Sequence, residues 1–491
     1  MSTQRPPARV PRRIPWLALV ALAYAAVQLT LVAPHLGLGW DETVYLSQVD
    51  PHRPAAYFSA PRSRGITFLT APVLGVTGSI TALRTVLALL SAAALYAAYR
   101  CGQPLLGHRR TALAALLFAG LWASVLYGSQ AMPNLWMALS ALAAAGWFLR
   151  AVHPHEQRRA LIGLGAMVAA ATCFRFSDGA WLALSLLAAC AAVSSWRRPG
   201  PALAVVTGFV AGGAEWITEA YLRWGGVGAR LHASSAIEGG MGLHWAGGMA
   251  WRSLNGPLLC RPCQLPLTHP AFTLWWLALP VLALLACVAA RHSRDRAVTL
   301  LPVACALALS IPYLLLIDYS APRFLLPAYA LLSPPLTHLA ALAARVCRPP
   351  GLRILTSGLG ALLLALHLAT QYPTLVHTVA TARAATARYR TAARDLHHLG
   401  LTPPCLVSGT HAPPIGYYAD CASANVGGNN RDTTSRALLH RATKEPTATL
   451  TTSRSTPPSY ARNWSAHPLP GTGLTAYAPS GRAAQAREAR R

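Results

Sequence analysis

Long apolar blocks with few charges are the feature that most constrains this chain. They recur between residues 14 and 371, and each is long enough to cross a hydrocarbon layer of about 30 Å, which takes roughly 20 helical residues. A helix satisfies its own backbone hydrogen bonds in lipid. The sequence therefore predicts an all-α polytopic membrane domain. About eleven spans are expected, at 14–34, 79–100, 111–128, 133–150, 160–175, 179–196, 201–221, 271–290, 297–317, 324–344 and 354–371.

The distribution of arginine predicts the orientation of these spans. Short cytoplasmic loops retain Lys and Arg, and the basic residues fall at the N-terminus and in alternate connections. We therefore expect a multi-pass protein of the cell membrane with a cytoplasmic N-terminus and an extracytoplasmic tail after residue 371. Much of the formal charge of +27 follows from this bias, and the basic residues are not interleaved with aromatics on one soluble face, so no nucleic-acid partner is expected.

The composition changes after the last apolar block. Three domains are predicted: a membrane domain at 1–371, a small extracytoplasmic α/β domain at 372–480 and a disordered tail at 481–491. The second begins with an expected helix lying against the membrane surface. Its expected elements are a surface helix at 373–399, a strand at 405–408, a Pro413-Pro414 turn, a helix near 434–444 and a strand at 447–452.

Four of the ten cysteines fall in predicted outer segments, as the pairs Cys260/Cys263 and Cys405/Cys421. An oxidising exterior favours disulfides between such pairs. Zinc binding by Cys260-Arg-Pro-Cys263 is the alternative, although no second pair with this spacing accompanies it.

Two adjacent carboxylates, Asp41 and Glu42, lie just beyond the first span. Acids at the start of a short helix cap its amides and suit its dipole, which is one interpretation. Neighbouring positions on a helix point in different directions, so Asp41 can also face a cavity while Glu42 caps or orients it. We predict Asp41 as a general base, with Glu42 as the second candidate.

Arginines at other outer junctions suit the binding of an anion. Arg62 and Arg64 precede an apolar segment at headgroup level, where they either hold a phosphate or attract lipid headgroups. Arg323 runs against the topology bias, and Pro322 and Pro327 fix the backbone beside it. A ligand-binding role is predicted for all three arginines.

Three further groups are candidates for the same outer cavity. Arg175 and Asp178 either contact a substrate or form a local salt bridge. Arg84, at the start of the second span, either reaches the cavity or extends to the interface. Glu215 and Glu219, four apart on one helix face, either bind a metal or an acceptor or form a solvated helix end.

Several segments, taken in chain order, resemble the polytopic lipid-dependent glycosyltransferases of the GT-C fold, especially the bacterial relatives of protein O-mannosyltransferases and aminoarabinose transferases. The resemblance covers roughly residues 14–345. It rests on the segments Asp41-Glu42-Thr43-Val44-Tyr45, Leu83-Arg84-Thr85-Val86-Leu87, Leu105-Leu106-Gly107-His108-Arg109-Arg110 and Arg323-Phe324-Leu325-Leu326-Pro327.

The resemblance implies that the first-loop acid, Asp41, is catalytic and that a polyprenyl-phosphate-linked sugar is the donor. Many members carry a second acid where this chain has Met132-Pro133-Asn134. An asparagine is not a base and is a weaker metal ligand, so a divalent metal is expected only if Asp178 or a glutamate at 215–219 takes its place.

This topology suits transfer outside the cell, because an activated lipid already crosses the membrane. Asp41 would deprotonate an acceptor hydroxyl, and arginines would hold the departing phosphate, with inversion at the sugar. The sequence leaves the sugar and the acceptor open. The alternatives are a transporter or lipid flippase, and a scaffold that acts through its outer tail. Transporters place polar sites near the midplane in broken helices, whereas charges here lie at span ends.

Overall fold

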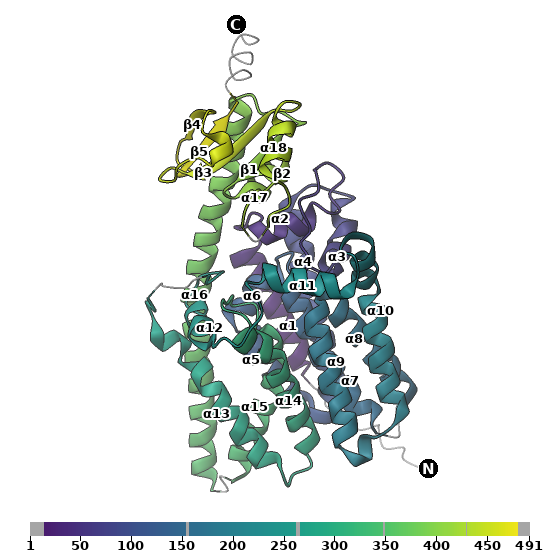
Figure 1. The fold of residues 1–491 in the computed structure, drawn as a ribbon. Helices are drawn as coiled ribbons and strands as arrows, with labels where there is room; N and C mark the ends of the chain where they lie inside the picture. Colours follow the sequence, from purple (N-terminus) through teal and green to yellow (C-terminus); the bar gives the residue numbers. More distant parts are fainter. Residues whose placement is uncertain (1–13, 154–156, 262–265, 347–348, 429, 480–491) are drawn as a thin grey trace, which may run out of the picture.

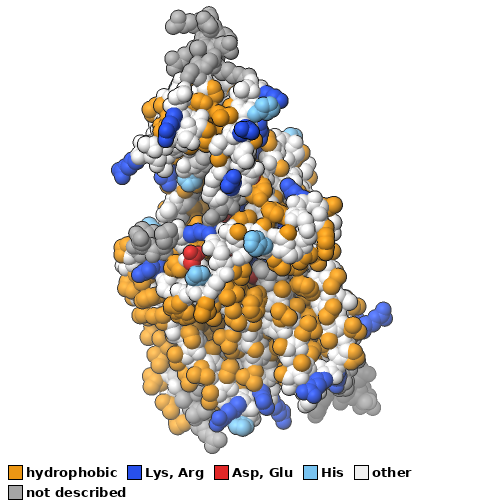
Figure 2. All heavy atoms as spheres, viewed as in Figure 1, with side chains coloured by type: hydrophobic (Ala, Val, Ile, Leu, Met, Phe, Trp, Pro, Cys, Tyr) orange, Lys and Arg blue, Asp and Glu red, His pale blue; other side chains and the backbone are white. Residues whose placement is uncertain are grey.

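The computed structural model describes residues 14–153, 157–261, 266–346, 349–428 and 430–479. A long helical bundle carries a small sheet domain at one end, and Figure 1 shows that the helix α16 (Pro350–His398) joins the two. The predicted tail at 481–491 lies outside the described residues. Hydrophobic side chains cover the visible face of the bundle, with Lys and Arg at the end far from the sheet domain (Figure 2).

The bundle is built from helices that occupy all eleven predicted ranges. Its helices are α1 (Trp16–Val27), η1 (Gln28–Val32), α2 (Trp40–Leu46), α3 (Gly65–Leu74), α4 (Ile80–Leu106), α5 (His108–Ala119), α6 (Trp122–Gly128), α7 (Pro133–Ala151), α8 (Gln157–Phe174), α9 (Phe176–Ala192), η2 (Ser194–Trp196), α10 (Pro199–Arg223), α11 (Val227–Ile237), α12 (Gly247–Ser253), η3 (Pro270–Thr273), α13 (Leu274–Ala290), α14 (Arg296–Ile311), η4 (Pro312–Leu316), α15 (Leu326–Val346) and α16 (Pro350–His398).

Five of the described helical segments are long and apolar enough to cross a membrane: α4, α10, η3 with α13, η4 with α14, and α16. The pair α5 and α6 makes a sixth if its two halves form one span. The number of predicted spans therefore exceeds the number that meet this criterion. Helix α7 is one that does not meet it, although neighbouring helices bury it along most of its length.

One predicted span is not straight. The range 111–128 bends by 80° between α5 and α6, where Gly120 and Leu121 interrupt the helix. The apolar segment 66–77, too short to span, forms the ten-residue helix α3.

The predicted surface helix at 373–399 is wrong. Residues 350–398 instead form one 49-residue helix, α16, which continues from the last predicted span to the sheet domain (Figure 1). Pro373 lies inside it. A proline removes one backbone donor, and a long helix tolerates that loss where neighbouring segments support it. Packing of α16 against α6, α15 and α17 (Ala412–Tyr418) supplies that support.

The sheet domain has five strands in the order β2-β1-β3-β5-β4. Strand β1 runs parallel to β2 and β3, whereas β5 runs antiparallel to β3 and β4. A disulfide joins Cys405 and Cys421, as the sequence predicts. The elements are β1 (Leu406–Gly409), α17 (Ala412–Tyr418), β2 (Ala422–Ala424), α18 (Ser435–Ala442), β3 (Thr447–Thr452), η5 (Ser459–Ala461), β4 (Ser465–Leu469) and β5 (Leu474–Ala478).

Two π-helical turns lead into the loops that carry polar residues. Turn η1 precedes the loop to α2, and η4 precedes the loop that contains Arg323. Insertions of this kind are frequent at functional sites, because they displace the following residues from the helical register. Both loops lie at the end of the bundle that carries the sheet domain (Figure 1).

Candidate active site

Asp41 lies between two arginines that come from distant parts of the chain. A side-chain nitrogen of Arg62 is 2.7 Å from Asp41 Oδ1, and one of Arg323 is 2.9 Å from Oδ2. The Asp41 side chain is 28% exposed, and the two arginine side chains are 12% and 13% exposed. The structure therefore brings together three of the predicted residues, with the carboxylate still open to a ligand.

The local sequence explains how Asp41 and Glu42 come to face different ways. Gly39 is extended and precedes α2, so both acids fall in the first helical turn. Adjacent positions on a helix are separated by about 100° around its axis. Glu42 turns back and accepts a hydrogen bond from the Gly39 amide at 2.9 Å. It therefore caps the helix, while Asp41 faces the arginines.

The arginines set the ionisation of Asp41. Burial raises the pKa of this carboxyl, but the positive charges of Arg62, Arg323 and, more weakly, Arg175 outweigh it and hold the pKa below its usual range. Asp41 is therefore an anion at neutral pH, and its basicity depends on how strongly the guanidiniums engage it.

Aromatic rings support the same arginines. The guanidinium of Arg62 lies 4.9 Å from the ring centre of Tyr45, and that of Arg323 lies 5.3 Å from the ring centre of Phe324. Cation–π contact holds a guanidinium without neutralising it. Both arginines consequently keep the ability to bind an anion.

Glu42 and Arg84 form a separate, fully buried pair. Two carboxylate–guanidinium contacts of 2.5 and 2.8 Å join them, and the Arg84 side chain is 0% exposed. Arg84 also donates to the carbonyls of Gly37 and Ser129, and Glu42 also accepts from the Ala131 amide. A substrate does not reach Arg84 in this arrangement, and the pair fixes three chain segments around α2.

Arg175 and Asp178 form the local salt bridge that the sequence offered as one alternative, at 2.8 Å. The hydroxyl of Tyr313 donates to Asp178 at 2.5 Å and accepts from Arg175 at 2.6 Å. Because the charge of Arg175 also acts on Asp41, this trio borders the Asp41 site.

Arg64 belongs to a different cluster. It lies 3.1 Å from Glu215 and 2.8 Å from Glu219, both on α10. Glu219 also pairs with Arg223 and Arg230. These glutamates are therefore paired with arginines, in place of the metal site or solvated helix end considered from the sequence.

Arg230 is a buried residue of this region that the sequence interpretation missed. Its guanidinium donates to the backbone carbonyls of Ala60, Arg62 and Trp216, and its side chain is 0% exposed. It thus holds the loop that presents Arg62. The signal was available, because Arg230, like Arg323, is an arginine on the predicted outer side, against the topology bias.

The described residues do not fit a metal held by several acids. No group of three or more His, Cys, Asp or Glu side chains within them is arranged to hold a metal ion. Asp178, Glu215 and Glu219 pair with arginines as described above. Asn134, which stands where the second acid would be, is fully buried, with no hydrogen-bond partner in the described part of the chain. Cys260 is buried, and its predicted partner Cys263 lies outside the described residues.

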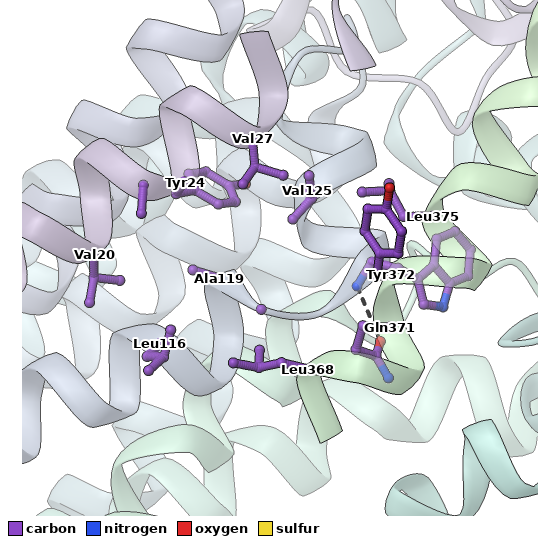
Figure 3. A pocket seen from close by; sticks show the side chains of 13 residues that line it. Val20, Tyr24, Val27, Leu116, Ala119, Val125, Leu368, Gln371, Tyr372 and Leu375 are labelled. Carbon is purple, nitrogen blue, oxygen red and sulfur yellow. Dashed lines mark hydrogen bonds between the residues drawn. The ribbon is translucent and has the colours of Figure 1, made fainter. Parts of the chain in front are cut away.

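An apolar pocket of about 250 Å³ lies between α1, α5, α6 and α16. Figure 3 shows its lining, in which the Gln371 side chain accepts from the Trp122 amide at 3.2 Å. No charged side chain lines it, so the pocket does not supply a phosphate site. The charged groups that suit an anion lie instead around Asp41.

The comparisons with known proteins concern the fold and the family. Residues 66–214 match the family model described as dolichyl-phosphate-mannose-protein mannosyltransferase. No curated protein sequence matches the chain.

Two solved structures show the fold. ArnT from Cupriavidus metallidurans, bound to undecaprenyl phosphate, aligns over 95% of this chain and 98% of its own, with a TM-score of 0.65 and 15% identity. The archaeal oligosaccharyltransferase AglB from Archaeoglobus fulgidus, in complex with an inhibitory peptide and a dolichol-phosphate, aligns over 95% of this chain and 74% of its own, with a TM-score of 0.50 and 13% identity. The chain has the GT-C glycosyltransferase fold, as its motifs predict.

Proposed function

We propose that this GT-C protein is a membrane glycosyltransferase that moves a sugar from a polyprenyl-phosphate donor to an acceptor on the extracytoplasmic face. The observation that carries the proposal is the Asp41 carboxylate shared by Arg62 and Arg323. A base and a pair of anion-binding groups are the parts that this reaction needs. The match to a mannosyltransferase family model and the lipid phosphates bound by ArnT and AglB support the donor class.

In the proposed reaction Asp41 takes the proton of an acceptor hydroxyl. The acceptor oxygen attacks the anomeric carbon, and the bond from that carbon to the phosphate oxygen breaks. The electron pair stays on the departing polyprenyl phosphate, which Arg62 and Arg323 stabilise. One displacement inverts the anomeric configuration.

The shared arginines couple donor binding to the strength of the base. Before the donor arrives, both guanidiniums engage Asp41 and hold its pKa low. The donor phosphate is a second anion that competes for the same fork-shaped donors. As the guanidiniums turn to the phosphate, the carboxylate loses partners and becomes more basic. Asp41 therefore gains basicity when the donor is in place.

The same proposal includes an orientation. Helix α2, which carries Asp41, and the sheet domain lie at one end of the bundle (Figure 1), and Lys and Arg also gather at the opposite end of the bundle (Figure 2). The basic residues of the short connections at that opposite end support its placement in the cytoplasm. The N-terminus would then be cytoplasmic and the sheet domain extracytoplasmic.

The test is to incubate the purified protein in lipid nanodiscs with a panel of polyprenyl-phosphate sugars and follow the release of polyprenyl phosphate. The wild type should release it with at least one sugar. Asp41→Asn should lower turnover about 10²–10⁴-fold, the usual contribution of a positioned base, and should still bind the donor.

Arg100→Ala is a suitable control, because Arg100 lies near the C-terminal end of α4, away from the end that carries Arg84, and contacts Gln103. Unchanged turnover in Asp41→Asn would move the base elsewhere. Release by neither protein across the whole panel would reject the donor class.

A further inference from the structure

The loop that leads to Asp41 is held at three successive residues by three different elements. Arg84 on α4 donates to the Gly37 carbonyl at 2.6 Å. The Leu38 amide donates to the hydroxyl of Tyr418 at 2.6 Å, and the Gly39 amide donates to Glu42 at 2.9 Å. Asp41 follows two residues later, in the first turn of α2.

The middle contact is unlike the other two, because it comes from the sheet domain. Tyr418 is the last residue of α17 and lies 380 positions after Leu38 in the chain. We propose that Tyr418 is a positioning residue for Asp41, so that the sheet domain forms part of the active site. This inference rests on the proposed function of Asp41.

The fit around Tyr418 leaves little room for movement. Leu38 is 1% exposed, and its amide donates its hydrogen bond to the Tyr418 hydroxyl, which takes the place of a water molecule. A Cβ atom added at Gly37 would lie 2.8 Å from the Thr386 Cβ and 3.0 Å from the Tyr418 hydroxyl oxygen. Distances below 3.0 Å require a shift of the neighbours. The glycine therefore permits α16 and α17 to approach the loop.

A second set of contacts docks the same helix onto the first outer loop. The Tyr417 hydroxyl donates to Asp50 at 2.8 Å, and Arg53 lies between Asp50 and Asp420 at 3.1 and 2.9 Å. The guanidinium of Arg53 also covers the Tyr417 ring, 4.2 Å from its centre. These contacts hold the sheet domain in place, and it is Tyr418 that hydrogen-bonds to the loop before Asp41.

The disulfide anchors the segment that contains α17. Cys405 precedes β1 and Cys421 precedes β2, so the bridge closes the segment that contains α17. Both cysteines and Ile415 on α17 belong to the buried core of the sheet domain. Tyr418 is therefore presented by a packed and cross-linked unit, as a residue that orients a catalytic loop needs to be.

The experiment compares Tyr418→Phe with Tyr417→Phe, the same substitution at the adjacent position, in the full-length protein in nanodiscs. The first readout is hydrogen–deuterium exchange of the peptide that covers residues 37–46. Tyr418→Phe should speed exchange there, whereas Tyr417→Phe should speed exchange at residues 47–53 and leave 37–41 protected. This readout does not depend on any enzymatic activity.

The second readout is kinetic. Tyr418→Phe should lower kcat on the order of tenfold, the equivalent of one net hydrogen bond in the transition state, with the donor KM unchanged. Because a smaller folded fraction would also lower the apparent kcat at unchanged KM, kcat is expressed per folded enzyme in both variants.

Exchange at 37–46 that matches the wild type in Tyr418→Phe would overturn the proposal, and so would unchanged kcat. If Tyr418→Phe does not fold, Gly37→Ala replaces it, because it crowds the same contact from the bundle side and should give the same two changes. If the wild type transfers no sugar, the proposed function fails, and the exchange readout still decides whether Tyr418 holds the loop.

Discussion

Asp41 and Glu42 are chemically similar neighbours in the chain, yet the structure gives them opposite environments. Asp41 is 28% exposed and shares two arginines that are themselves within reach of solvent. Glu42 is 4% exposed and is held by Arg84, which is 0% exposed, and by two backbone amides. One helical position thus separates a carboxylate that a ligand can reach from one that is committed to the fold. The exposure of the arginine partners therefore distinguishes Asp41, the candidate catalytic carboxylate, from Glu42.

The largest expected effect tests whether Glu42 is structural. Glu42→Gln leaves the buried guanidinium of Arg84 without a counter-charge, which should lower stability by about 3–5 kcal/mol. Asp41→Asn also leaves two guanidiniums without their carboxylate, but the site is partly exposed, so this variant should lose less stability than Glu42→Gln. Thermal unfolding in nanodiscs measures both variants.

A double variant sharpens this comparison. Replacing both partners, as Glu42→Gln with Arg84→Met, removes the unpaired charge and should recover part of the lost stability. Glu42→Gln that unfolds like the wild type, or Asp41→Asn that loses more stability than Glu42→Gln, would reverse the roles assigned to the two acids.

The next effect concerns the partners of Asp41. Arg323→Ala removes a charged hydrogen-bond donor worth about 1.5–3 kcal/mol, so the donor KM should rise roughly 10–100-fold. Arg323→Lys keeps the positive charge but loses the planar guanidinium that can donate two parallel hydrogen bonds. Its donor KM should lie between those of the wild type and the alanine variant. Steady-state kinetics with a responsive donor measures the change. A loss confined to kcat, with KM unchanged, would show that Arg323 does not hold the donor in its ground state.

Much of the fold could be predicted because lipid imposes long apolar helices, and helices occupy every predicted range. The continuation of α16 beyond residue 371 could not be predicted, since Pro373 and the arginines after it resemble the start of a new surface helix. Continuity there depends on packing against α6, which lies far away in the sequence, and against α17 of the sheet domain. The strands β2 and β4 were not predicted because neither contains a β-branched or aromatic residue, and β5 was not predicted either.

The candidate site shows the same division. Asp41 and Arg323 could be selected from the sequence because charges at span ends are rare and run against the topology bias. Their contact at 2.9 Å joins residues 282 apart and follows only from the fold. Arg84 and Arg64 satisfied the same sequence criterion, yet they pair with Glu42 and with the glutamates of α10. Sequence identifies the charged groups, and tertiary structure decides which of them stay available.

The smallest effect is on pH dependence. The positive charges around Asp41 lower its pKa, and the ionised form is the base. Activity should therefore be fully present above that pKa and lost as pH falls through it, so the acid limb of kcat/KM should lie below the ordinary pKa of an aspartate. Arg323→Ala removes one of the charges responsible, and the limb should move to higher pH.

Arg223→Ala is the matched control for this limb. Arg223 is half exposed and pairs with Glu219, and it is not among the charges that act on Asp41. It should leave the limb in place. Profiles of kcat/KM from pH 3 to 8, after a check that each variant survives the acid incubation, measure the position. A limb that moves equally in both variants would mean that the titrating group is not the carboxylate paired with Arg323.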